Sequence, residues 1–255
     1  MRIAIITIAG ISSRFNQGIS EENKILKCLY TEGGKENTLL YHLMKKCSFA
    51  DHIILVGGYK YEDLCAFYKN ELSTEFPNVK LVENDYYADL GSGYSLYLGI
   101  KSSTEYIPDE VLFVEGDLDI DDESFSKVLK SEKSVLTYTH EPIYANKAVV
   151  LYRDSLEHYK YAFNSSHGLL SIDEPFSCIL NSGQMWKFTD FQALAEANEE
   201  FFNNDKAGTN LRIIQRYIDT VDSESIKLIP LIRWTNCNTR EDYQTIKNFW
   251  EDEVK

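Results

Sequence analysis

A short apolar run at the N-terminus limits the fold more than any other stretch of the chain. Residues 3–8 are all isoleucine, alanine or threonine, and the run stops at Ala9 and Gly10. A segment of this length and β-branched content predicts a buried strand of a parallel sheet, because it is too short for a buried helix.

Similar runs recur along the first half of the chain, and helical patterns separate them. The predicted strands are residues 52–56, 79–82 and 111–115, and the predicted helices are residues 39–47 and 61–72. Strands that alternate with helices of this length predict right-handed βαβ units. We therefore expect an α/β fold with three α/β/α layers and a mainly parallel, Rossmann-like sheet. A turn or hairpin is expected at residues 30–35, which contain Gly33 and Gly34.

The second half of the chain predicts a more mixed sheet. The strands expected there are residues 134–139, 147–153, part of 176–188 and 226–232, and the helices are residues 122–129, 190–203, 208–221 and from 239 onward. Residues 164–175 are expected to form a loop. No linker or internal repeat separates the halves, so residues 1–255 are predicted to form one domain.

Composition excludes several classes of protein. The net charge of −14, from 40 acidic and 26 basic residues, disfavours a nucleic-acid-binding surface. The sequence contains no run of 18 apolar residues, so no membrane span is predicted. The five cysteines are scattered and never spaced as C-x-x-C, which argues against a disulfide framework or a zinc site and fits a reduced, cytoplasmic setting.

The loop after the first predicted strand has the composition of a phosphate site. Gly10, Ile11, Ser12 and Ser13 precede Arg14, and Lys24 and Lys27 follow about a dozen residues later. Small residues let backbone N–H groups approach an anion, and arginine and lysine add positive charge. The alternative is an ordinary strand-to-helix turn with exposed basic residues.

Asp117 is the most informative carboxylate, because it follows a predicted buried strand and Gly116. A charge in that position needs a partner or a cation, and an aspartate there is a natural oxygen ligand for Mg²⁺. Asp117 could instead cap the next helix. Together with Asp119 it also forms a D-x-D run, which would suit a metal-dependent glycosyltransferase.

The order of these motifs resembles that of nucleotidyltransferases with a glycosyltransferase-A-like fold, and in particular the phosphocholine-type cytidylyltransferases. The shared patterns are A-G-x-x-S-R from Ala9, K-x-L from Lys27, N-D-x-Y from Asn84, G-D at Asp117 and W-x-N-x-N-x-x-E-D-Y from Trp234. The resemblance runs from residue 3 to about residue 243 and is weakest between 120 and 230. It implies a nucleotide-diphospho-sugar transferase-like fold, with a nucleotide-binding half to about residue 120 and an acceptor-binding half beyond it.

The resemblance also implies roles for individual residues. Arg14 would hold the β- and γ-phosphates, Lys27 would neutralise the α-phosphate and the acceptor phosphate, and Asp117 and Asn238 would bind Mg²⁺. The remaining nucleotide contacts would come from Ala9, Gly10, Ile11, Ser12, Ser13, Asn84, Gly93 and Ser95. Acceptor contacts are expected from Tyr94, Trp186, Trp234 and Asn236, although core packing is an alternative for each aromatic residue.

Four positions depart from the family pattern, and one of them, Leu26 in place of the proline before Lys27, should matter little chemically. Ser12 replaces a glycine, Asn238 replaces a metal-binding aspartate, and Asn236 replaces a glutamate whose charge would suit choline. An asparagine oxygen can still bind a hard cation, but more weakly. The loss of the charge at position 236 favours an acceptor of mixed polarity, such as L-glutamine phosphate, over phosphocholine.

The resemblance therefore implies a Mg²⁺-dependent cytidylyltransferase that transfers CMP from CTP to a small phosphorylated acceptor and releases pyrophosphate. With L-glutamine phosphate the product would be CDP-L-glutamine, used in the modification of bacterial capsule or surface polysaccharide. The alternatives are a phosphocholine cytidylyltransferase, a sugar-1-phosphate nucleotidyltransferase, a D-x-D glycosyltransferase and a nucleotide-binding regulatory module without catalysis. The protein is expected to be a monomer or homodimer. Ser165, Ser166, His167 and Asp173 have the residue types of a hydrolase triad, but no nucleophile-elbow motif accompanies them.

Overall fold

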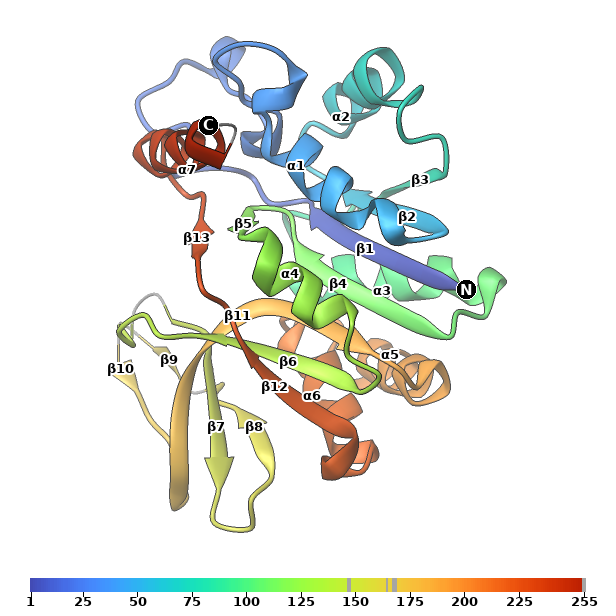
Figure 1. The fold of residues 1–255 in the computed structure, drawn as a ribbon, viewed down its shortest axis with the longest axis vertical. Helices are drawn as coiled ribbons and strands as arrows, with labels where there is room; N and C mark the ends of the chain where they lie inside the picture. Colours follow the sequence, from blue (N-terminus) through green and yellow to red (C-terminus); the bar gives the residue numbers. More distant parts are fainter. Residues whose placement is uncertain (146–147, 164, 167–168, 254–255) are drawn as a thin grey trace.

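A nine-stranded mixed sheet forms the centre of the computed structural model, which describes residues 1–145, 148–163, 165–166 and 169–253. The strands follow the order β12-β6-β11-β4-β1-β2-β3, with β7 paired to β11 and β8 paired to β7. Helices cover both faces of this sheet (Figure 1). The predicted three-layer α/β fold is therefore confirmed.

The parallel half of the sheet is built around the N-terminal strand. β1 (Arg2–Ile8) lies between β2 (His52–Gly57) and β4 (Glu110–Glu115), and β3 (Val79–Glu83) extends the sheet beyond β2. Along β1, Ala4 and Ile6 point into one hydrophobic cluster, whereas Ile3 and Ile5 point into the other. Burial on both faces explains why this strand has an uninterrupted apolar sequence.

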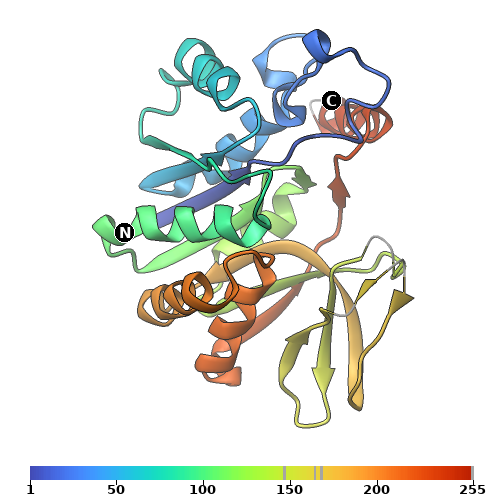
Figure 2. The same ribbon diagram turned by 180° about the vertical axis from the view of Figure 1, so that it is seen from behind.

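Separate groups of helices cover the two faces of the sheet (Figures 1 and 2). The helices α1 (Leu39–Lys46), α4 (Asp122–Leu129) and α7 (Arg240–Glu253) share a cluster with Ala4 and Ile6. The other face is covered by α3 (Ser92–Ser103), α5 (Phe191–Asp205) and α6 (Leu211–Thr220). Gly99 lets α3 approach β1 closely, since an added Cβ would lie 2.6 Å from Cγ2 of Ile5.

The second half of the chain adds antiparallel strands to the same sheet. The long strand β11 (Phe176–Phe188) pairs with β4, β6 (Ser134–Thr139) and β7 (Val150–Asp154), and β12 (Ile226–Pro230) lies parallel to β6. β7, β8 (Tyr159–Tyr161) and the first part of β11 form an arm that projects from the body of the molecule (Figure 1). The sheet takes strands from both halves, while the prediction of a single domain remains a prediction.

Several short elements differ from the prediction, because they are too short to show a periodic pattern. The expected loop at residues 164–175 contains β9 (Ser165–Ser166) and β10 (Leu169–Leu170), and β8 was not expected. The predicted helix 61–72 is α2 (Tyr61–Phe67) followed by a π-helical turn, Tyr68–Leu72. Bends and a 3₁₀ turn at Lys35–Asn37 follow residue 30, and no strand pairing forms a hairpin among residues 30–35. Lys147, the expected start of β7, and His167 lie outside the described residues.

One unpredicted pairing positions the C-terminal segment. β13 (Trp234–Asn236) pairs antiparallel with β5 (Leu118–Ile120), which directly follows the end of β4. The backbone N–H of Cys237 donates to the carbonyl of Asp117 at 2.7 Å. This contact brings residue 238 beside residue 117, although they are far apart in sequence. In the described part of the chain, no helix has the length and apolar character needed to cross a membrane.

Candidate active site

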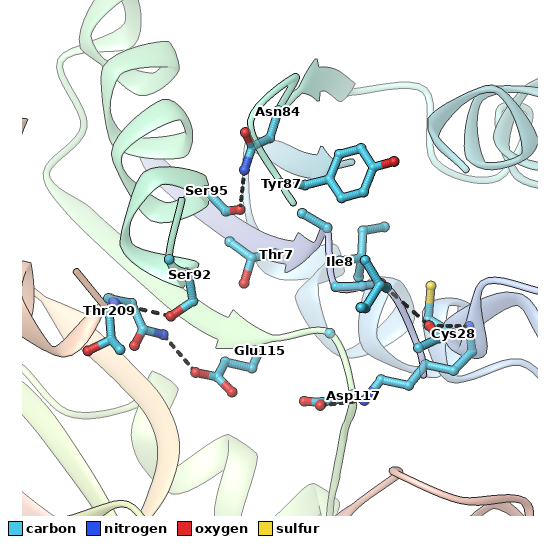
Figure 3. Close-up of a pocket in the computed structure, with 18 of the residues that line it drawn as sticks. Thr7, Ile8, Cys28, Asn84, Tyr87, Ser92, Ser95, Glu115, Asp117 and Thr209 are labelled. Carbon is cyan, nitrogen blue, oxygen red and sulfur yellow. Dashed lines mark hydrogen bonds and ion pairs between the residues drawn. The ribbon is translucent and has the colours of Figure 1, made fainter. Parts of the chain in front are cut away.

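A cavity of about 510 Å³ opens at the carboxyl ends of β1 and β4 (Figure 3). Its walls come from the loop after β1, the 3₁₀ turn Lys27–Leu29, the segment 84–95, the end of β4, residues 209–211 and Asn238. Ligands of open α/β sheets bind at this edge, where the strand order allows a crevice. The cavity also contains most of the residues that the sequence predicts for a nucleotide site.

The loop after β1 is held in shape by its own side chains. Ser12 has a φ of +54°, the left-handed conformation that glycine adopts without strain. Its Oγ accepts a hydrogen bond from the N–H of Lys27 at 3.2 Å and donates to the carbonyl of Gly10 at 3.4 Å. The left-handed φ explains why a glycine would suit this position. In this chain the position is a serine, and its hydroxyl links the loop to the Lys27 segment by a hydrogen bond.

Lys27 is the basic residue that reaches the centre of the cavity. Its Nζ lies 2.7 Å from Oδ2 of Asp117, and these side chains are only 17% and 20% exposed. The neighbouring residues Cys28 and Leu29 are buried and anchor the 3₁₀ turn. Lys24, in contrast, pairs with Glu21 and does not line the cavity.

Arg14 and Asn238 meet at the same end of the cavity. The guanidinium of Arg14 donates to Oδ1 of Asn238 at 2.7 Å, and Nζ of Lys27 lies 3.5 Å from the same oxygen. The N–H groups of Asn238 and Thr239 donate to the carboxylate of Asp242, which fixes the start of α7. Four predicted residues from three distant parts of the chain are therefore linked by a chain of contacts, from Arg14 through Asn238 and Lys27 to Asp117.

Asp117 and Asn238 have the donor atoms that a magnesium ion requires. Oδ1 of Asp117 is buried and has no hydrogen-bond partner among the described residues, and Oδ1 of Asn238 lies 3.5 Å from Nζ of Lys27, which pairs with the other carboxylate oxygen of Asp117. The described residues contain no group of three or more His, Cys, Asp or Glu side chains suited to a metal. Mg²⁺ commonly takes one or two protein ligands and completes its shell with waters and substrate phosphates, so the two oxygens fit this ion.

Asp119 does not belong to this site. Its carboxylate pairs with Arg233 and accepts a hydrogen bond from Nε1 of Trp250 at 2.9 Å, and the residue is 2% exposed. Asp119 does not line the cavity, whereas Asp117 does. A D-x-D metal pair is therefore not formed, and that prediction is wrong.

The predicted nucleoside contacts are brought together only in part. Asn84 is 1% exposed and donates from Nδ2 to Oγ of Ser95 at 2.8 Å, and both residues line the cavity. Gly93 does not line it, because the residue packs against Phe201 and its N–H donates to the carbonyl of Gly208. A Cβ added at position 93 would lie 2.4 Å from Cζ of Phe201. Packing against Phe201, and not contact with a nucleotide, therefore explains the glycine.

None of the four predicted acceptor residues lines the cavity. Trp186 is fully buried, stacks on Phe113 at 5.0 Å and donates to the Tyr161 hydroxyl at 2.6 Å, so its assignment to the acceptor is wrong. Tyr94 stacks on other aromatic residues of the α3 face, and Trp234 donates from Nε1 to the carbonyl of Gly183. Asn236 is partly buried, and its Oδ1 has no partner among the described residues.

Three residues that the sequence did not indicate do line the cavity. The carboxylate of Glu115 accepts hydrogen bonds from Nδ2 of Asn210 at 2.7 Å and from Nε2 of Gln184 at 3.1 Å. Burial and the nearby Asp117 carboxylate raise the pKa of Glu115 to about 7. Only the position of Glu115, at the end of a predicted strand two residues before Asp117, could have pointed to this group.

Solved structures of nucleotidyltransferases share this fold. The inositol-1-phosphate CTP transferase from T. maritima aligns with a TM-score of 0.67 and 19% identity over 96% of this chain and 95% of that chain. A candidate glucose-1-phosphate thymidylyltransferase from Bacillus anthracis aligns with a TM-score of 0.68 and 14% identity over 98% and 95%. HddC from Yersinia pseudotuberculosis aligns with a TM-score of 0.62 and 17% identity over 98% and 100%. At such low identity these alignments establish the nucleotidyltransferase fold.

Sequence comparison adds the family. No curated protein sequence matches the chain. A family model described as "Domain of unknown function (DUF6564)" matches residues 23–250, which is nearly the whole chain and includes Lys27, Asp117 and Asn238. The chain therefore belongs to the DUF6564 family.

Proposed function

We propose that this protein is a magnesium-dependent cytidylyltransferase that transfers CMP from CTP to a small phosphorylated acceptor and releases pyrophosphate. The observation that carries the proposal is the convergence of Arg14, Lys27, Asp117 and Asn238 in one cavity. Two cationic side chains suit a polyphosphate, and a buried, unpartnered carboxylate oxygen suits a metal ion.

In the proposed reaction, an oxygen of the acceptor phosphate attacks the α-phosphorus of CTP. The bond between this phosphorus and the oxygen that bridges to the β-phosphorus breaks, and pyrophosphate leaves with that electron pair. Lys27 would neutralise charge at the α-phosphorus, and Arg14 would hold the leaving phosphates. The acceptor phosphate is already ionised at neutral pH, so no side chain has to remove a proton.

The ligand-free contacts indicate how the site would rearrange. Lys27 is paired with Oδ2 of Asp117, and Arg14 is bonded to Oδ1 of Asn238, so both cations contact residues that we assign to the metal. Phosphate oxygens would take the place of these oxygens as partners of the two cations. A magnesium ion held by Asp117 and Asn238 would supply additional charge neutralisation at the phosphates.

The choice of nucleotide and acceptor forms the finer part of the proposal. Asn84 and Ser95 offer polar groups for the base and ribose, and a structural neighbour that is a CTP transferase supports CTP as donor. For the acceptor we propose L-glutamine phosphate, which would give CDP-L-glutamine for the modification of bacterial capsule or surface polysaccharide. The resemblance to phosphocholine-type enzymes supports this choice. We place the reaction in the cytoplasm and expect a monomer or homodimer.

Pyrophosphate release tests the proposal. The purified protein is incubated with each of the four nucleoside triphosphates and Mg²⁺ across a panel of phosphorylated acceptors that includes sugar 1-phosphates. We expect release with CTP, and a loss of at least about 100-fold in turnover for Lys27→Ala and for Asp117→Ala. Lys24→Ala is the matched control, because Lys24 lies outside the cavity, and its rate should be unchanged.

Other outcomes would support other functions. Turnover only with a sugar 1-phosphate would indicate a sugar-1-phosphate nucleotidyltransferase. Binding of nucleotide without turnover on any acceptor would indicate a regulatory module. Near-normal rates in both Lys27→Ala and Asp117→Ala would refute the site.

A further inference from the structure

One carboxylate in the cavity has no assigned role and no cationic partner. The charged residues that line the cavity, within the described chain, are Arg14, Lys27, Glu115 and Asp117. Asp117 is paired with Lys27. Glu115 forms no ion pair with any described residue and is hydrogen-bonded only to the neutral amides of Asn210 and Gln184. Glu115 therefore has no cation of its own among the described residues that line the cavity.

The two amides hold Glu115 from different elements of the fold. Asn210 is 4% exposed and lies at the N-terminus of α6, where its N–H is bonded to Oγ of Ser92. Gln184 has a φ of +55° and lies where the pairing of β11 with β6 shifts register between Ser182 and Trp186. A non-glycine residue in this conformation is strained, and bulges of this kind redirect side chains. The strained residue is therefore the one whose side-chain amide donates to Glu115.

The carboxylate lies inside the cavity and apart from the phosphate-binding end. In Figure 3, Glu115 lies on the side of Thr209 and Ser92, whereas Asp117 lies on the side of Cys28. Oδ1 of Asp117, also buried, has no partner among the described residues. A ligand group placed beside Glu115 would therefore meet a carboxylate that is paired with no cation among the described residues.

We propose that Glu115 determines acceptor specificity by binding an ammonium group of the phosphorylated acceptor, and that Asn210 and Gln184 position it. This inference rests on the proposed function, since it names the class of acceptor for the same cavity. A hydroxyl group would only add a hydrogen bond to Glu115. An ammonium group would also offset the charge of a carboxylate that burial has separated from water, and so gains more.

The inference changes the expectation drawn from position 236. The loss of a glutamate there suggested a cavity with no charge for a cationic acceptor. Asn236 does not line the cavity, and Glu115 supplies the negative charge from the end of β4 instead. An acceptor with both a phosphate and an amine, which includes L-glutamine phosphate and phosphocholine-like amines, is expected to be preferred over polyols such as sugar phosphates.

Matched acceptors test the inference. Pyrophosphate release with CTP is measured for 2-aminoethyl phosphate and 2-hydroxyethyl phosphate, and for L-glutamine phosphate and its analogue without the α-amino group. For wild type we expect at least about a tenfold preference in kcat/KM for the amine of each pair. In Glu115→Gln the preference should fall to near one because KM rises for the amines alone. The control Glu62→Gln, the same change on exposed α2, should keep the wild-type preference.

Further readouts separate Glu115 from the other functions of the cavity. KM for CTP and the Mg²⁺ concentration for half-maximal rate should not change in Glu115→Gln. A changed Mg²⁺ requirement would make Glu115 a metal ligand and overturn the inference, as would equal effects on amine and hydroxyl acceptors. Equal wild-type rates for both members of each pair would overturn it without any variant.

A binding measurement keeps the inference distinct from the proposed function. If no nucleoside triphosphate reacts with any acceptor, the proposed function fails. The affinities of 2-aminoethyl phosphate and 2-hydroxyethyl phosphate are then compared by NMR titration in the presence of a non-hydrolysable CTP analogue. Tighter binding of the amine that Glu115→Gln abolishes would still support the recognition of ammonium, and equal binding would refute it.

Discussion

His42 is expected to make the protein lose stability in mildly acidic solution. The residue lies on α1, where its ring stacks on Trp250 of α7 at 3.8 Å, and its Nε2 lies 2.8 Å from the carbonyl oxygen of Glu36. Burial lowers the pKa of His42 from its ordinary value of 6.5 to about 4, an effect that the nearby Lys46 and Lys45 reinforce. The folded protein therefore keeps this imidazole neutral at a pH where the unfolded chain protonates it.

The sign and size of the effect follow from linkage. Between the unfolded pKa of 6.5 and the folded pKa of about 4, the unfolded state binds more protons, so stability falls as the pH falls. Integrated from about pH 7 to about pH 4.5, the difference amounts to about 2 kcal/mol of unfolding free energy. That is a large fraction of the stability of a typical domain.

Urea unfolding at a series of pH values measures this difference. The reference is His42→Gln, whose amide can still donate to the Glu36 carbonyl but does not titrate. Other groups titrate in both proteins, so the difference between the two pH profiles isolates His42. We expect wild type to lose about 2 kcal/mol more than His42→Gln over this pH range. Parallel profiles would refute the burial of a neutral imidazole between α1 and α7.

Three further predictions concern the candidate site and the core. Ser12→Gly removes the strain of a left-handed φ but also removes the hydrogen bond to the N–H of Lys27. Each effect is about 1 kcal/mol and the two have opposite signs, so the urea midpoint of this variant should stay close to that of wild type. Ser12→Ala keeps the strain and should lose about 1 kcal/mol; equal losses in both variants would contradict this account. Trp186→Ala should lower the unfolding free energy by about 3–5 kcal/mol, and a stable variant with a raised acceptor KM would return Trp186 to the acceptor site. Asp117→Asn should raise the Mg²⁺ concentration for half-maximal pyrophosphate release about 10-fold or more, and an unchanged requirement would remove Asp117 from the metal site.

Features of the fold that depend on physical constraints within one segment could be predicted from the sequence. Residues 3–8 had to be apolar at every position because both faces of β1 are buried, and this pattern identified the parallel sheet. The small residues after β1 and the acid at the end of β4 follow from the same topology, since ligands bind where strands end. Arg14, Lys27 and Asp117 were predicted for this reason. In the structure Lys27 pairs with Asp117, and Asn238 contacts both Lys27 and Arg14; their roles in catalysis remain predictions.

Features that depend on which face of a strand or helix a side chain lies on could not be predicted from the sequence. Trp186 occupies a strand whose two faces meet different surroundings, and the sequence does not tell which face turns toward the cavity. Glu115 gains its environment from Asn210 and Gln184, which are 95 and 69 residues away. No local pattern marks either amide, because one depends on a bulge and the other on the packing of α6. Such contacts are made only when the chain folds, because they join residues that are far apart in the sequence.

The central claim is that the cavity transfers a nucleotidyl group to an acceptor phosphate. ³¹P NMR of the protein with CTP, Mg²⁺ and L-glutamine phosphate labelled with ¹⁸O on its phosphate tests this claim most directly. The account predicts pyrophosphate without label and a CDP-linked product whose bridging oxygen carries ¹⁸O, because an acceptor oxygen attacks the α-phosphorus. Formation of CMP and pyrophosphate with the acceptor unchanged, or intact CTP with every acceptor offered, would contradict the account.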